Sequence, residues 1–114
     1  MYENTYPEKR FKITLEFLKK HVPPPAEILD LGVENPFSRL LSSEGYTVEN
    51  TRGQDLDEDQ SQLKASSAEI TTAFEIFEHL LSPLEVLKSL RGNYLFASVP
   101  LKLWFANAYQ SKTD

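Results

Sequence analysis

The 114-residue sequence contains no cysteine, and nowhere does it contain a long apolar run. The absence of cysteine excludes disulfide bonds, thiolate zinc sites and a cysteine nucleophile. No apolar run is long enough to cross a bilayer, and residues 1–12 have no apolar core of the signal-peptide type. We therefore expect a cytoplasmic protein that does not enter a membrane.

Positive charge is also scarce. Twelve lysines and arginines stand against seventeen aspartates and glutamates, so the net charge is −5, and acids cluster in the run "DLDED" at residues 55–59. Because no basic surface is available to neutralise phosphates, we do not expect nucleic acid as a direct partner. With 40% hydrophobic and 25% charged residues, the chain fits a single globular domain over residues 1–114.

Strand and helix patterns alternate along the chain. Apolar residues recur at helical spacing over about residues 7–22, with Pro7 suited to the first turn and three prolines ending the pattern. Short apolar or β-branched runs predict strands at residues 27–32, 46–51, 70–74 and 94–99. The alternation indicates an α/β fold whose mainly parallel sheet is covered by helices on both faces.

Two further helices are predicted between these strands. Asn35 and Pro36 provide a cap and a first-turn proline, and the apolar face that follows is Phe37, Leu40 and Leu41. Ser82, Pro83 and Glu85 form a capping-box pattern before a helix whose apolar face is Leu84, Leu87 and Leu90. The polar segment after the second strand, residues 52–67, is expected to be a connection without a clear helix.

Three segments carry a family resemblance: "ILDLG" at residues 28–32, "TAFEIFEHLLSP" at 72–83 and "YLFASVPL" at 94–101. Their order and spacing over residues 27–101 resemble the Rossmann-like class of S-adenosylmethionine-dependent methyltransferases. The part "EIFEHLLSP" is the more specific, because many small-molecule methyltransferases of this class have a glutamate-histidine pair and a proline-started helix there. The resemblance implies a Rossmann-like three-layer α/β/α fold and a small-molecule methyl acceptor.

The resemblance also implies a set of cofactor-binding residues. In the family, the glycine after the first strand lets the backbone approach the methionine part of the cofactor, and Gly32 stands there. An acid at the end of the second strand binds the ribose hydroxyls, for which Glu49 is the nearest candidate, and Asp55 matches an acid near the adenine. The full implied set is Asp30, Gly32, Glu34, Glu49, Asp55, Ala73, Phe74 and Glu75.

The glycine motif departs from the family pattern. Glu34 stands at the second glycine and Pro36 at the third. The charge of Glu34 would face the cofactor's carboxylate unless the side chain turns away, and Pro36 removes one N–H donor at the helix start. We therefore expect weak cofactor binding that Glu34→Gly improves modestly. The alternative function is a non-catalytic methyltransferase-like protein that serves binding or assembly.

Glu75, Glu78 and His79 raise the question of a metal or acid-base site. We expect no metal. His79 is the candidate catalytic base, because it follows the strand end where substrates approach, and the alternative is that it anchors the loop before Ser82. An NTP-binding phosphate loop and a serine-hydrolase elbow are both missing from the sequence.

The C-terminal segment, residues 102–114, is rich in large apolar groups. Trp104, Phe105 and Tyr109 have little chain left to cover them. Because an aromatic patch of this kind marks a missing partner surface, we expect either a further C-terminal segment or a homo-oligomer to cover it. We favour the fragment interpretation, in which the fold is incomplete at its C-terminal end.

Overall fold

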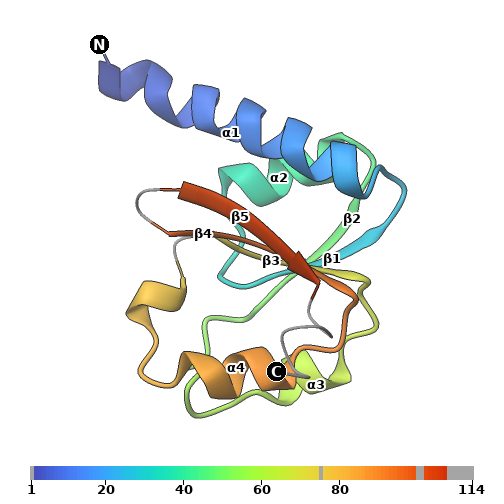
Figure 1. Cartoon of the computed structure of the whole chain (residues 1–114), viewed down its shortest axis with the longest axis vertical. Coiled ribbons are helices and arrows are strands. Elements are labelled where there is room, and N and C mark those ends of the chain that lie inside the picture. The colour runs from blue at the N-terminus through green and yellow to red at the C-terminus, as the bar shows by residue number, and fades with distance from the viewer. Residues whose placement is uncertain (1, 75, 100–101, 108–114) are drawn as a thin grey trace.

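A computed structural model describes residues 2–74, 76–99 and 102–107, with the backbone alone at residues 2–8, 78, 99 and 102–107. Its elements follow one another as α1 (Tyr2–His21), β1 (Glu27–Asp30), α2 (Pro36–Ser43), β2 (Thr47–Asn50), α3 (Ser61–Ala65), β3 (Ile70–Phe74), the 3₁₀ helix η1 (Phe77–His79), α4 (Pro83–Ser89), β4 (Tyr94–Val99) and β5 (Lys102–Asn107). Figure 1 shows the sheet at the centre of the molecule with helices on both sides.

The sheet has the strand order β2-β1-β3-β4-β5. Strands β1 to β4 are parallel, and β5 runs antiparallel to β4. The predicted Rossmann-like α/β fold with a mainly parallel sheet is thereby confirmed. The chain passes from β1 outward to β2 and then returns to β3 on the other side of β1, so the topological switch point lies between β1 and β3.

Neighbouring residues of β1 point to opposite faces of the sheet and so build two separate cores. Ile28 packs with Leu18 of α1 and Leu41 of α2, whereas Leu29 packs with Leu63 of α3 and Val86 of α4. Figure 1 shows the same division, with α1 and α2 on one face of the sheet and α3 and α4 on the other. The three-layer arrangement therefore follows from the two-residue period of the strand.

The predicted start of α2 is confirmed in detail. The Oδ1 atom of Asn35 accepts a hydrogen bond from the Ser38 backbone N at 2.9 Å, and the Ser38 Oγ accepts one from the Asn35 N at 2.9 Å. Two backbone donors at the helix start are thus satisfied reciprocally, although the residue three positions on is a serine and not a glutamate. This cap fixes the direction in which the chain leaves β1.

The first two strands are shorter than predicted, at residues 27–30 and 47–50, and two predictions about helices were wrong. Helix α1 begins at Tyr2, so Pro7 lies within the helix and not at its first turn. The polar connection after β2 contains the short helix α3, which the sequence did not predict. A five-residue helix offers no repeat of apolar positions, and only Gln62 and Leu63 of α3 are buried, so its sequence carries no amphipathic period.

The predicted details of α4 also need correction. The Ser82 side chain makes no capping hydrogen bond. The backbone N atoms of Leu81 and Ser82 instead donate to the Asp57 carboxylate at 2.8 Å each, which ties the acidic loop to this helix start. Leu84 is 68% exposed, because this segment packs against the sheet through Val86 of α4 and Leu90, the residue that follows the helix.

Several sequence predictions fall on parts of the chain that are not described. Glu75 and Tyr109 lie outside the described residues, and so do the side chains of Glu78, Trp104 and Phe105. In the backbone register of β5, Trp104 pairs with Ala97 and Phe105 with Phe96. The expected cover over these aromatic residues therefore stays a prediction. None of the helices in the described ranges has the length and apolar character that crossing a membrane requires.

Candidate functional site

A pocket of about 380 Å³ opens at the carboxyl ends of β1, β3 and β4, beside the switch point of the sheet. Its walls come from α1, from the turn between β1 and α2, and from the ends of β3 and β4. Ligands in open parallel sheets bind at this edge, because the strand ends and the helix N-termini leave a crevice there. We call it the switch-point pocket.

Gly32 forms the part of this pocket wall that follows β1. Its φ of +125° lies in the region that favours glycine. The turn is held in place because the Gly32 N donates to the Thr51 Oγ1 at 2.7 Å and its carbonyl accepts from the Asn50 Nδ2 at 3.0 Å. The end of β2 therefore fixes a turn that presents backbone, with no side chain, to the pocket.

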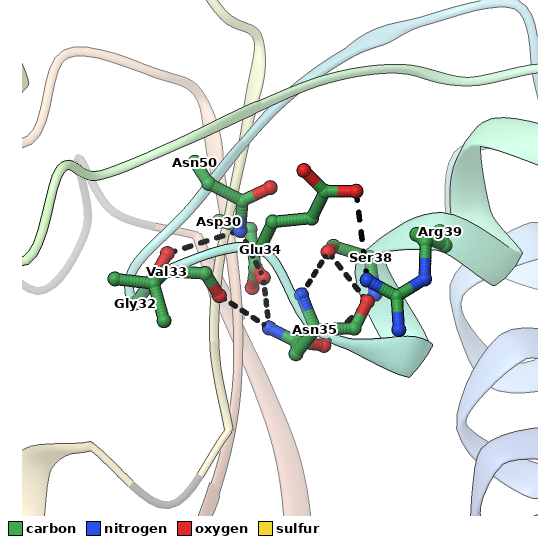
Figure 2. A network of polar contacts seen from close by, with 8 residues as sticks. All are labelled: Asp30, Gly32, Val33, Glu34, Asn35, Ser38, Arg39 and Asn50. Carbon is green, nitrogen blue, oxygen red and sulfur yellow. Dashed lines mark hydrogen bonds and ion pairs between the residues drawn. The ribbon is translucent and has the colours of Figure 1, made fainter.

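Asp30 lies at the base of the same turn and is only 3% exposed. One carboxylate oxygen accepts from the Thr72 Oγ1 at 2.6 Å, and the other accepts from the Asn50 Nδ2 at 2.9 Å and the Asn35 Nδ2 at 3.2 Å. Figure 2 shows how Asn35 and Asn50 converge on this carboxylate. Burial raises the pKa of Asp30, and the three hydrogen bonds oppose that rise.

Three phenylalanines from different elements make an aromatic wall. The ring of Phe37 lies between Phe11, with ring centroids 5.1 Å apart, and Phe74, at 5.2 Å in an edge-to-face arrangement. All three line the switch-point pocket. Such a wall suits the apolar body of a ligand, and the edge-to-face packing holds the rings in fixed positions.

Arg10, Thr14 and Ser98 add polar groups to the pocket, and sequence reasoning did not identify any of them. The Arg10 Nη2 donates to the Ser98 Oγ at 3.3 Å, which joins α1 to the end of β4. Ser98 is only 2% exposed. A signal was present in the sequence, because Arg10 and Thr14 are one helical turn apart at the edge of the apolar face of α1.

Glu34 does not line the pocket, although its neighbour Pro36 does. Its carboxylate lies 3.5 Å from the Arg39 Nη1 in an exposed ion pair. Figure 2 shows the Glu34 side chain extended toward Arg39. In this conformation of the turn, the Glu34 carboxylate therefore does not face the pocket and would not repel a carboxylate bound there.

Of the residues that the resemblance implies, Asp30, Gly32 and Phe74 line the switch-point pocket together. Glu49 does not join them, because it is the adjacent Asn50 that points toward Asp30. The Glu49 carboxylate accepts from the Gln62 Nε2 at 2.8 Å and lines a second pocket of about 410 Å³ against α3.

Asp55 and Ala73 of the implied set, and the catalytic candidate His79, lie outside the switch-point pocket. Asp55 is exposed, and its Oδ1 accepts from the Asp57 backbone N at 3.0 Å within the acidic loop. Ala73 is fully buried in the core between the sheet and the α3 and α4 helices. His79 is exposed at the end of η1 and does not line the switch-point pocket.

Within the described ranges, no three histidine, aspartate or glutamate side chains lie close enough to hold a metal ion. What the switch-point pocket offers chemically is a glycine turn, a buried carboxylate, an aromatic wall and an arginine. Comparison of the chain with protein-family models, with curated proteins and with solved structures finds no match.

Proposed function

We propose that the protein is an S-adenosylmethionine-dependent methyltransferase that acts on a small-molecule acceptor. The observation that carries this proposal is the switch-point pocket, in which Gly32 and Phe74 meet at the carboxyl ends of β1 and β3. These are the residues that the family resemblance assigns to the methionine side of the cofactor. The pocket volume, about 380 Å³, falls in the range of small-molecule sites, roughly 300–1,000 Å³.

The residues on the methionine side fit the cofactor. Gly32 offers a wall without a side chain, in a backbone conformation that other residues rarely adopt. Glu34 is paired with Arg39 outside the pocket, and an exposed pair of this kind contributes about 0–1 kcal/mol. Replacement of Glu34 by glycine is therefore expected to change the affinity little, in place of the modest improvement that the sequence alone suggested.

When bound, S-adenosylmethionine supplies an electrophilic methyl group on its sulfonium. The chain's own contribution is to bind and orient the reacting partners and to exclude water from them. The aromatic wall formed by Phe11, Phe37 and Phe74 serves the exclusion of water. His79 is exposed and does not line the pocket, so it is not placed to act as a catalytic base there.

The position of Glu49 favours a second candidate function. Its carboxylate accepts from Gln62 and lines the other pocket, so it does not provide an acid for the cofactor's ribose in the switch-point pocket. A methyltransferase-like protein that binds or assembles without the cofactor fits this placement. The two candidates differ in whether S-adenosylmethionine binds at all.

Calorimetric titration with S-adenosylmethionine tests the proposal. Thr14 is 8% exposed and lines the pocket, so Thr14→Phe should fill it, whereas Ile13→Phe adds a ring at a neighbouring site that is 58% exposed. We expect the parent to bind one equivalent and Thr14→Phe to lose roughly tenfold or more in affinity, about 1.4 kcal/mol. Ile13→Phe should bind as the parent does.

Two results would contradict the proposal. A folded parent that does not bind S-adenosylmethionine would favour the non-catalytic candidate. A Thr14→Phe variant that keeps the parent's affinity, with its fold verified by circular dichroism, would place binding outside the switch-point pocket.

A further inference from the structure

We infer that the Thr14 hydroxyl binds a hydroxyl group of the small molecule that occupies the switch-point pocket. The inference deepens the proposed function and rests on it for the identity of the cofactor. Thr14 lies within α1 and lines the pocket from that side. The residue is only 8% exposed, so its hydroxyl has little contact with bulk water.

The Thr14 hydroxyl forms no hydrogen bond to any residue that the structure describes. Within a helix, a threonine hydroxyl often donates to the carbonyl four residues earlier, here that of Arg10, and this bond is not formed. No fully enclosed side-chain oxygen or nitrogen of the described residues lacks a partner, so the Thr14 oxygen is open to the pocket. Because a polar group without a partner is costly to keep from water, a ligand atom in the pocket would complete it.

The other polar side chains of the described pocket wall are already engaged with the protein. Both oxygens of Asp30 accept hydrogen bonds from side chains. The Asn35 side chain donates through its nitrogen and accepts through its oxygen. Arg10 and Ser98 are joined to each other. Thr14 is therefore the described polar residue of the wall whose side chain is left for a ligand, and it is uncharged.

The surroundings of Thr14 indicate the chemistry of the ligand. A hydroxyl has one donor and two acceptor positions, so it pairs in either direction with another hydroxyl. Phe11 lies three residues earlier on the same side of α1, and its ring packs against Phe37 in the aromatic wall. The pocket therefore suits a flat apolar ligand, such as a phenol, whose ring lies against this wall and whose hydroxyl meets Thr14.

Two sources can supply the ligand hydroxyl: the methyl acceptor and the ribose of the cofactor. For the acceptor, we would titrate the parent and Thr14→Val with p-cresol and with toluene, which differ in the hydroxyl alone. For the cofactor, we would titrate both proteins with adenosine and with dideoxyadenosine, which differ in the two hydroxyls of the ribose ring. Valine keeps the branch at Cβ, so the variant removes the hydroxyl and changes the shape of the side chain little.

If Thr14 binds the acceptor's hydroxyl, Thr14→Val should weaken p-cresol binding about 3- to 10-fold and leave toluene and adenosine binding unchanged. If it binds a ribose hydroxyl, the variant should weaken adenosine by a similar factor and leave dideoxyadenosine and p-cresol unchanged. Thr14→Ser keeps the hydroxyl and should bind each probe nearly as the parent does. Because the free protein loses no hydrogen bond, urea unfolding of Thr14→Val without ligand should give an unfolding free energy no lower than the parent's.

Thr47→Val is the matched control, because it makes the same change at an exposed position of β2, and it should leave all four titrations unchanged. The inference fails if Thr14→Val binds p-cresol and adenosine as the parent does, weakens the probes with and without the hydroxyl equally, or is less stable than the ligand-free parent. A parent that binds none of the four probes contradicts the inference, even if it binds S-adenosylmethionine. A parent whose p-cresol affinity depends on Thr14, but which does not bind S-adenosylmethionine, contradicts the proposed function alone.

Discussion

Two substitutions of Asp30 separate the stability that comes from its hydrogen bonds from the cost of burying its charge. Asp30→Ala removes the acceptor of three hydrogen bonds. The amides of Asn35 and Asn50 still donate to the Val33 and Gly32 carbonyls at 2.9 and 3.0 Å, but Thr72 is fully buried and its hydroxyl loses the carboxylate. Because a buried donor left unsatisfied costs about 1–3 kcal/mol, we expect a loss of about 2 kcal/mol in unfolding free energy.

Asp30→Asn should behave differently, because it keeps the shape and an oxygen that faces Asn35 and Asn50. Burial raises the pKa of Asp30, so the ionised carboxylate is itself unfavourable in the native state at neutral pH. Removing that charge offsets the weaker hydrogen bonds of an amide. We expect the unfolding free energy of Asp30→Asn at pH 7 to lie within about 1 kcal/mol of the parent's.

The Asp30 carboxyl also makes the unfolding free energy of the parent depend on pH. Since the pKa of Asp30 is raised above its ordinary value of 3.8 in the native state, the native protein keeps a proton that the unfolded chain releases. This contribution to stability is fully present below pH 3.8 and is lost as the pH rises through the raised native pKa. The unfolding free energy of the parent, compared with that of Asp30→Asn, should therefore fall as the pH rises from 3.8 through the native pKa.

Urea unfolding of the three proteins, followed by circular dichroism over a series of pH values, measures both effects. The reasoning is refuted if Asp30→Ala is as stable as Asp30→Asn at pH 7. It is also refuted if the difference between the parent and Asp30→Asn does not change with pH.

Three further predictions concern the scaffold, each measured by urea unfolding. Asn35→Ala removes the capping box of α2 and should cost about 1 kcal/mol, whereas Ser43→Ala at the exposed end of that helix should cost much less, and equal losses would contradict the capping role. Gly92→Ala should cost about 1–3 kcal/mol because its Cβ would lie 2.6 Å from the Glu69 carbonyl oxygen, so an unchanged stability would show that the backbone yields there. Burial raises the pKa of Tyr46 to about 12, so the parent should lose stability as the pH rises from 10.0 through that value and Tyr46→Phe should not.

Much of the fold was predictable because local chemistry sets it. The strands at Ile70–Phe74 and Tyr94–Val99 were predicted with their observed bounds, since each is a run made mostly of apolar and β-branched residues. Asn35 and Pro36 gave the start of α2 for the same local reason. Helix α3 was not predictable, because five residues with one apolar side chain in the core carry no period.

The site was predictable only where it is local. Asp30 and Gly32 follow from the turn after a buried strand, whereas Arg10 and Ser98 are 88 residues apart and meet because α1 crosses the sheet. Glu49 shows how an error of one residue changes the assignment. Asn50 points to Asp30, so its neighbour Glu49 points to the other face of β2 and contacts Gln62. Spacing along the sequence does not determine which of two neighbours faces the site.

The most direct test of the central claim is a titration of the ¹⁵N-labelled protein with S-adenosylmethionine, followed by amide chemical shifts. If the switch-point pocket binds the cofactor, the shifts should cluster at Gly32, Asn35, Phe74 and Ser98, which line it. The account is contradicted if no amide shifts at saturating cofactor, or if the shifts centre on Gln62 and Ser66 in the second pocket.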